Sequence, residues 1–176
     1  MRNLEIKTHV TSLAPVRARL RTLRPAARQP VVRQTDSYFR VPKGRLKLRV
    51  FGSERRGELI CYFRPNRSAA RTSDFQVLPV ADAAGTLGLL EDMFGLRTRV
   101  RKRREVWLYQ NARIHLDTVA GLGRFVEIEV MVTSGMTQAR RLMGELRRAL
   151  GLRSADLIAG SYSDMLSRRQ RRGARD

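Results

Sequence analysis

Cysteine is almost missing from this chain: Cys61 is the single one among 176 residues, so no internal disulfide can form. It stands between Ile60 and Tyr62 in an apolar run, where a small core residue is expected rather than a nucleophile. Long apolar stretches are missing too: no run approaches the roughly 18 residues of a membrane span, and the start of the chain does not read as a signal peptide. We therefore expect a cytoplasmic protein that has no membrane partner.

Acidic and aromatic residues are both scarce. The chain has 16 Asp and Glu against 36 Lys and Arg, which gives a net charge of +20 and a pI near 11.7. Such a charge favours a polyanionic partner, and weak, non-specific binding of nucleic acid or polyphosphate is expected from charge alone. Aromatic side chains that could stack on bases make up only 6% of the sequence, and no nucleic-acid recognition motif is present.

Several catalytic signatures are absent. The sequence has no P-loop, no His-Glu-x-x-His and no paired cysteine motif. Its two histidines, His9 and His115, are too few for a histidine-rich metal site. His115 shares a strand face with Asp117, and both an interior-lining and a structural role stay open for it.

Two short strand-like rows gather carboxylates in this very basic chain. Asn3-Leu-Glu5-Ile-Lys7 and Phe125-Val-Glu127-Ile-Glu129 both alternate charged or polar residues with apolar ones, so the charges of each row share one face. Asp117 comes shortly before the second row. Carboxylates gathered on inner strand faces predict a divalent cation, with the surrounding Arg and Lys left to bind a polyanion.

A third row is basic. Arg45-Leu-Lys47-Leu-Arg49 alternates strictly and places all its cations on one face. Lysines are rare in this arginine-rich chain, yet Lys7, Lys47 and Lys102 all fall within alternating segments. A compact ammonium differs chemically from a guanidinium, so these positions indicate a specific phosphate or carboxylate contact.

Strands dominate the predicted elements. Apolar stripes predict helices near 13–24, 82–94 and 137–150, and a short one near 155–158; alternation and apolar runs predict strands at 2–10, 34–39, 45–50, 59–63, 71–75, 100–109, 113–119 and 125–132. An open sheet with one wet face would explain any single charged row. A closed barrel with a polar interior and helices outside explains all the rows together.

The order of motifs resembles the CYTH domain family, the triphosphate tunnel metalloenzymes, which includes class IV adenylyl cyclases and thiamine triphosphatases. The resemblance rests on the rows above and on five further motifs in the same order: Gln34-Thr-Asp36-Ser-Tyr38-Phe39, Arg64-Pro65, Lys102-Arg-Arg104, Ile114-His-Leu-Asp117 with Gly121-Leu-Gly123, and Gly160-Ser-Tyr162-Ser-Asp164. It implies an α+β fold, an eight-stranded antiparallel barrel with helices packed outside. We expect residues 1–167 to form this tunnel domain and 168–176 a basic, flexible tail.

The resemblance also implies roles for residues. Glu127 and Lys7 would be catalytic, with Glu127 orienting a water as general base and Lys7 facing the substrate. The implied phosphate-binding residues are Lys7, Arg45, Lys47, Arg49, Arg64, Lys102 and Arg104. The implied ligands of Mg²⁺ or Mn²⁺ are Glu5, Asp117, Glu127 and Glu129. Alternation alone does not choose Lys102 and Arg104 over Arg101 and Arg103 as the inward pair; the resemblance does.

One position departs from the family pattern. Asn3 stands where the family has its first acidic residue. Its amide oxygen is a further candidate ligand, although a neutral oxygen lacks one charge of attraction for a hard cation. In the alternative interpretation, Glu5, Glu127 and Glu129 suffice and Asn3 only forms hydrogen bonds.

Three functions follow in order of preference. The first is metal-dependent hydrolysis of a triphosphate-bearing small molecule, namely a nucleoside triphosphate, tripolyphosphate or thiamine triphosphate. The second is cyclic AMP formation from ATP by a class IV adenylyl cyclase, for which no residues of an adenine pocket are evident. The third is a non-catalytic polyphosphate or RNA binder, which leaves the acidic rows unexplained. Both a monomer and a homodimer are compatible with the sequence.

Overall fold

The computed structural model describes residues 1–24, 26–63 and 69–173. Its strands are β1 (Arg2–Val10), β2 (Ala27–Arg28), β3 (Val32–Phe39), β4 (Arg45–Phe51), β5 (Gly57–Phe63), β6 (Arg71–Val80), β7 (Leu96–Tyr109), β8 (Ala112–Val119) and β9 (Gly123–Met131). Its helices are α1 (Ala14–Thr22), α2 (Ala83–Phe94), α3 (Met136–Ala149) and α4 (Tyr162–Gly173), with one 3₁₀ turn, η1 (Ser154–Asp156).

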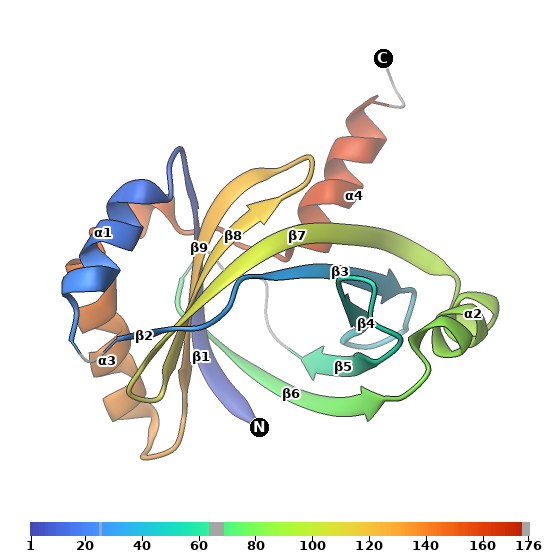
Figure 1. Ribbon diagram of the computed structural model, residues 1–176, viewed down its shortest axis with the longest axis horizontal. Coiled ribbons are helices and arrows are strands. Elements are labelled where there is room, and N and C mark those ends of the chain that lie inside the picture. The colour runs from blue at the N-terminus through green and yellow to red at the C-terminus, as the bar shows by residue number, and fades with distance from the viewer. Residues whose placement is uncertain (25, 64–68, 174–176) are drawn as a thin grey trace.

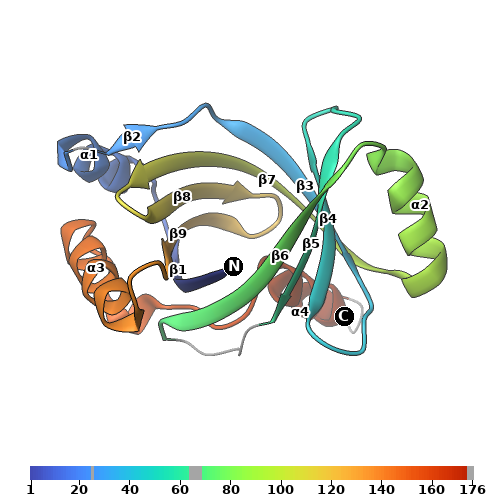
Figure 2. The same cartoon turned by 90° about the horizontal axis from the view of Figure 1, so that it is seen from below.

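The strands form one antiparallel sheet that closes on itself (Figures 1 and 2). The order is β2-β7-β3-β4-β5-β6-β1-β9-β8, and an additional pairing between β7 and β8 completes the circle. Eight strands therefore make a barrel, and β2 pairs with β7 outside it. The predicted α+β barrel with external helices is confirmed.

Alternation along the strands separates a charged interior from an apolar exterior. On β1, Leu4 and Ile6 face outward and are almost fully buried because α1 and α3 cover this side of the barrel. The two helices contribute apolar stripes to the same core: Val16 and Leu20 from α1, and Ala139, Leu142, Met143 and Leu146 from α3. Packing on this outer face fixes the register of β1, and with it the inward direction of its charged residues.

A second, smaller core lies under α2 at the other end of the molecule (Figure 1). Phe39, Leu48 and Leu90 are buried there. Asp82 caps α2 by accepting a hydrogen bond from the Gly85 amide at 3.2 Å, and Gly95 ends the helix with a φ of +68°. This core holds the β3–β4 hairpin, which carries much of the cationic interior.

Several elements differ from those predicted. β6 extends to Val80 and β7 begins at Leu96, because these added residues pair with β5 and β3 respectively. The short β2 was not predicted, since its two residues have no alternation to detect. α4 was not predicted as a helix, and it continues to Gly173, so the expected tail from Arg168 is helical up to that residue. Among the helices of the described residues, none combines the length and apolar character needed to cross a bilayer.

Candidate functional site: a charged tunnel

A cavity of about 330 Å³ runs inside the barrel. All eight barrel strands, the start of α4 and the residue before it supply its polar lining. This lining comprises Asn3, Glu5, Lys7, Gln34, Tyr38, Lys47, Arg49, Glu58, Tyr62, Ser73, Lys102, Arg104, Arg113, His115, Glu127, Glu129, Ser161 and Tyr162, with Glu58 and Arg113 at its more exposed edge. Charges of both signs face this space, and they segregate onto opposite walls.

One wall is built around Asp36 of β3, which is completely buried. Lys47 from β4 and Lys102 from β7 each donate to Asp36 Oδ2, at 3.1 and 3.0 Å, and Arg49 donates to both carboxylate oxygens at 2.8 and 3.2 Å. Asp36, Lys47, Arg49 and Lys102 are called the Asp36 cluster below. One carboxylate therefore holds three cations side by side at the cavity wall.

The charges of the Asp36 cluster shift one another's pKa. Burial alone would raise the pKa of Asp36, but Arg49, Lys102 and Lys47 outweigh it and hold that pKa well below its ordinary value. Burial, aided by the neighbouring Arg49, lowers the pKa of Lys47 to about 7. Burial and Arg104 lower the pKa of Lys102 to about 8. The two ammonium groups thus sit close to their titration range at neutral pH, where an added anion would stabilise the protonated form.

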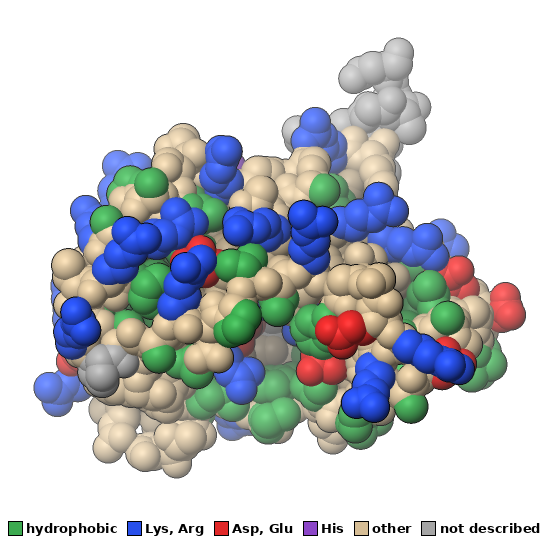
Figure 3. Space-filling view, viewed as in Figure 1, with side chains coloured by type: hydrophobic (Ala, Val, Ile, Leu, Met, Phe, Trp, Pro, Cys, Tyr) green, Lys and Arg blue, Asp and Glu red, His purple; other side chains and the backbone are tan. Residues whose placement is uncertain are grey.

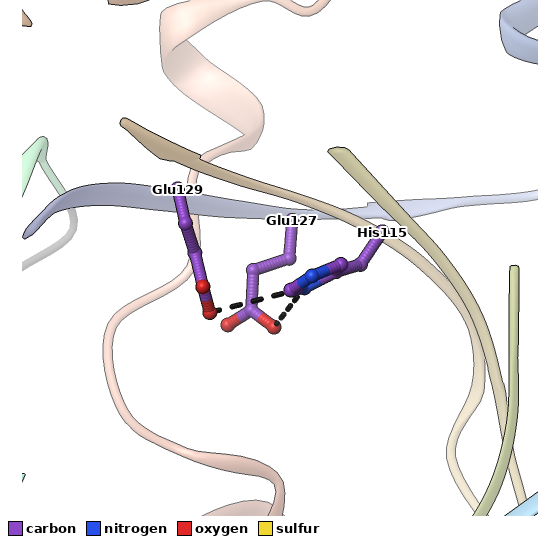
Figure 4. A group of neighbouring side chains, drawn as sticks. All are labelled: His115, Glu127 and Glu129. Atoms are coloured by element: carbon purple, nitrogen blue, oxygen red, sulfur yellow. Dashed lines mark hydrogen bonds and ion pairs between the residues drawn. The ribbon is translucent and has the colours of Figure 1, made fainter. Parts of the chain in front are cut away.

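The opposite wall is acidic and comes from β1, β8 and β9. Glu5 pairs in register with Glu129, and Lys7 with Glu127, which in turn lies opposite His115 on β8. His115, Glu127 and Glu129 turn toward one another, and their ligand atoms all lie within 4.8 Å (Figure 4). His115 Nδ1 is 3.5 Å from Glu127 Oε2 and 3.8 Å from Glu129 Oε1. These three residues are called the His-Glu-Glu cluster.

Glu127 connects the two walls. Its carboxylate is 3.1 Å from Lys7 Nζ and accepts a hydrogen bond from Arg104 at 2.9 Å. Burial would raise the pKa of Glu127, but Lys7, the hydrogen bond with His115 and Arg104 hold it well below its ordinary value. Glu127 is therefore a carboxylate at every pH near neutrality.

Two buried amide oxygens in the lining lack a partner. Asn3 Oδ1 and Gln34 Oε1 are shielded from solvent and accept no hydrogen bond within the described residues. Asn3 is only 3% exposed and lies two residues before Glu5 on the same strand face. An unpaired buried acceptor beside a carboxylate cluster is costly unless a cation or a donor on a ligand completes it.

The structure brings most of the predicted site residues to the cavity. Asn3, Glu5, Lys7, Lys47, Arg49, Lys102, Arg104, Glu127 and Glu129 all line it, whereas Arg101 and Arg103 are exposed on the outer face of β7. Two predicted residues lie elsewhere: Asp117 is buried away from the cavity lining, and Arg45 borders a neighbouring cavity. The predicted Arg64 lies outside the described residues.

Asp117 is engaged by Arg104 rather than grouped with the other candidate metal ligands. Arg104 donates two hydrogen bonds to it, at 2.7 and 2.6 Å, and the Tyr162 hydroxyl donates a third at 2.9 Å. Arg45 donates to Asp164 at 2.9 Å and borders a second cavity, between the β3–β4 loop and α4. It is thus close to the tunnel but separated from the Asp36 cluster.

Sequence reasoning missed four residues of the site. Asp36 and Tyr162 were noted only as parts of motifs, Arg71 only as a strand residue, and His115 was left undecided. Tyr162 covers the ammonium of Lys7, which lies 3.8 Å from its ring centroid. Arg71 donates to Glu5 at 2.9 Å. Asp36 and His115 could have been found from their positions in alternating segments. Alternation predicts on which face of a strand a side chain lies, but it does not predict which residues that side chain contacts.

The fold is a closed antiparallel barrel, and its interior brings clustered cations together with a group of carboxylate and imidazole side chains. The family model of the CYTH domain matches residues 1–162, and the chain therefore belongs to the CYTH domain family. Adenylate cyclases and triphosphatases are found in this family, whose members act on triphosphates.

Solved structures share the fold at low identity. The PH1012 protein from Pyrococcus horikoshii OT3 is similar with a TM-score of 0.83 and 22% identity, over 92% of this chain and 98% of that chain. A candidate adenylate cyclase from Vibrio parahaemolyticus is similar with a TM-score of 0.75 and 19% identity, over 94% of this chain and 97% of that chain. A second candidate adenylate cyclase, from Bacillus halodurans, has a TM-score of 0.51 and 15% identity, over 85% of this chain and 89% of that chain. No curated protein matches the chain.

Proposed function

We propose that the protein hydrolyses a triphosphate-bearing small molecule with the help of a divalent cation. The observation that carries this proposal is the division of one cavity into a cationic wall, the Asp36 cluster, and a facing wall with the His-Glu-Glu cluster. Phosphoryl transfer depends mainly on positioning the phosphates and neutralising charge on their oxygens, which such a pair of walls provides.

The phosphates would lie against the Asp36 cluster. Lys47, Arg49 and Lys102 already converge on one carboxylate, so their donors are held in place before a ligand enters. Arg104 is held in the same way by Asp117, which we assign to positioning Arg104 rather than to metal binding. Preorganised cations avoid the reorganisation that flexible side chains would need, and this strengthens binding of the transition state.

The donor set of the acidic wall fits a divalent cation. Glu129 and Glu127 supply carboxylate oxygens, His115 an imidazole nitrogen and Asn3 an amide oxygen that lacks a partner. Glu5, the register partner of Glu129, adds a third carboxylate to the same wall. Mg²⁺ or Mn²⁺ held there would neutralise charge on the phosphate oxygens. Carboxylate and amide oxygens, which make up most of this set, are the ligands that suit Mg²⁺ and Mn²⁺.

Two charged side chains lie between the walls. Lys7, held by Glu127 and Tyr162, would contact the phosphate that is attacked. Glu127 stays ionised, because its pKa is held low, so it can accept a hydrogen bond from the attacking water and orient it. A carboxylate of such low pKa is a weak base, and we therefore assign to Glu127 orientation of the water rather than complete removal of its proton.

The reaction product tests the proposal. Purified protein is incubated with tripolyphosphate, ATP or thiamine triphosphate, each with Mg²⁺, with Mn²⁺ or with chelator. Hydrolysis predicts metal-dependent release of orthophosphate. A cyclase would instead release pyrophosphate and cyclic AMP from ATP and would leave tripolyphosphate intact, because that molecule has no attacking hydroxyl. Cyclic AMP as the main product, or no product with any of the three substrates, would overturn the proposal.

A further inference from the structure

The tunnel does not account for the charge of this protein. Its interior carries six cations and five carboxylates, which nearly cancel: Lys7, Lys47, Arg49, Arg71, Lys102 and Arg104 against Glu5, Asp36, Asp117, Glu127 and Glu129. The net charge is nevertheless +20, so almost all of the excess lies outside the tunnel.

Part of that excess forms a row along the outer face of β7. Arg97, Arg99, Arg101 and Arg103 occupy alternate positions of this strand, and all four are exposed. Figure 3 shows Lys and Arg side chains gathered over β7 in a band across the molecule. Alternate residues of a strand are roughly 6.6 Å apart, so the four arginines span about 20 Å.

Arg33 of β3 widens the row. It is exposed and lies directly opposite Arg103 in the antiparallel register. Like charges in opposite positions of a strand pair destabilise the sheet. At one end of the row, Arg97 is paired with Asp164 and Arg99 with Glu91. In the other half, Arg33, Arg101 and Arg103 have no carboxylate partner within the described part of the chain. The cations of such an unpaired group repel one another, and an anion that binds across the group relieves this repulsion.

We propose that this arginine row (Arg33, Arg97, Arg99, Arg101 and Arg103) binds the phosphate backbone of a single-stranded nucleic acid. The guanidinium group pairs with phosphate oxygens through two parallel hydrogen bonds. One cation on every second residue matches a polymer with one charge per unit better than a polyphosphate chain, whose charges lie much closer together. β7 is long and curved (Figure 1), and a flexible single strand can follow it, whereas a duplex is stiff over this length.

The row predicts binding without sequence preference. Trp107 on the same strand is buried, so it offers no face on which a base could stack. The contacts are therefore to phosphates, and affinity should fall steeply with salt as counterions are released. The inference does not depend on the proposed hydrolysis, because none of these five side chains lines the tunnel cavity.

The experiment compares two triple variants of equal charge. R33Q/R101Q/R103Q removes the unpaired half of the row, and R140Q/R141Q/R148Q removes three exposed arginines from α3. Binding of fluorescein-labelled oligouridylate and oligothymidylate, each about 12 nucleotides long, is followed by anisotropy between about 50 and 200 mM salt. Thermal unfolding of both variants, and orthophosphate release from tripolyphosphate where the wild type shows it, report that the barrel is intact.

We expect the row variant to lose affinity at least tenfold and its plot of log affinity against log salt to flatten by about two, since each phosphate contact contributes roughly 0.7. The α3 variant should change far less, and RNA and DNA should bind alike. Equal losses in both variants would show diffuse attraction and overturn the proposal. So would a strong preference for RNA over DNA, or binding of inorganic polyphosphate by a protein that does not bind the oligonucleotides.

Discussion

Lys47 Nζ lies 3.1 Å from Asp36 Oδ2, in a site where the carboxylate is fully buried. The same oxygen also accepts from Lys102, and Arg49 covers the other side of the group. Asp36 is thus the shared counterion of three cationic side chains at the cavity wall before any phosphate arrives.

Replacing Asp36 with Asn should destabilise the free protein. Three buried cations would lose their shared counterion, and removal of one partner from a buried ion pair costs about 3–5 kcal/mol. A bound polyanion can replace the missing charge, so tripolyphosphate should restore more stability to D36N than it adds to the wild type. Urea unfolding with and without tripolyphosphate measures both effects. Equal stability of D36N and wild type would contradict the role given to Asp36.

Phosphate binding should become weaker as the pH rises from about 6.5 to 9. In the free protein the pKa of Lys47 is lowered to about 7 and that of Lys102 to about 8. A bound phosphate favours the charged ammonium and raises both values, so the complex holds more protons than the free protein. Binding therefore takes up protons, and affinity falls once the free lysines deprotonate. Calorimetric titration with tripolyphosphate in buffers of different ionisation enthalpy measures the uptake.

The control for this pH dependence is Lys47→Arg, because a guanidinium stays charged throughout the range. Ionisation of tripolyphosphate itself affects both proteins equally. Proton uptake should be smaller in K47R than in the wild type by part of one proton. Identical uptake in the two proteins would mean that Lys47 is already fully charged without ligand.

Glu129→Gln should remove most metal-dependent turnover while the fold is kept, because the change is nearly isosteric and affects the proposed cation. Glu5→Gln should act in the same direction, since Glu5 lies opposite Glu129 across the β1–β9 pair. Glu145→Gln on α3 is a matched control at an exposed position far from the cavity lining. Calorimetric Mn²⁺ titration and orthophosphate release are measured for each variant. Near wild-type turnover in both E129Q and E5Q would contradict the metal assignment.

His115 should bind Mn²⁺ through its ring nitrogen. Pulsed electron paramagnetic resonance of the Mn²⁺-loaded protein should show coupling to an imidazole nitrogen, which His115→Gln abolishes. His9→Gln should keep the coupling, because His9 packs edge-on against Phe125 and does not line the cavity. Bound Mn²⁺ without nitrogen coupling would remove His115 from the ligand set but leave the carboxylate ligands in place. Absence of Mn²⁺ binding would contradict the whole set.

The sequence predicted the barrel because alternation is a property of each strand by itself. The rows containing Glu5, Lys47 and Glu127 could be placed on inner faces without any tertiary information. Lys102 was an exception: the run Arg101 to Arg104 is basic at every position, so only the family pattern predicted that Lys102 faces inward.

The sequence could not show in the same way which charged side chains pair with one another inside the barrel. Asp117 alternates correctly with the acidic rows, yet Arg104 from the neighbouring strand pairs with it and occupies both of its oxygens. Asp36 belongs to the basic side of the tunnel because β3 lies between β4 and β7, and only the sheet order shows that. Arg71 likewise reaches Glu5 because β6 pairs with β1. These relations depend on strand neighbours that are distant in the sequence.

The pairing of β1 with β9 has a consequence for synthesis on the ribosome. Glu5 leaves the ribosome more than a hundred residues before its register partner Glu129 is added. Until then, Glu5 and Lys7 lack the β9 residues that lie opposite them, and the outer residues of β1 lack the helix α3 that covers them. Pairings over such sequence distances form slowly. The nascent chain must therefore keep β1 from other partners until β9 and α3 have been made, and the charged cavity forms in the same step as the fold.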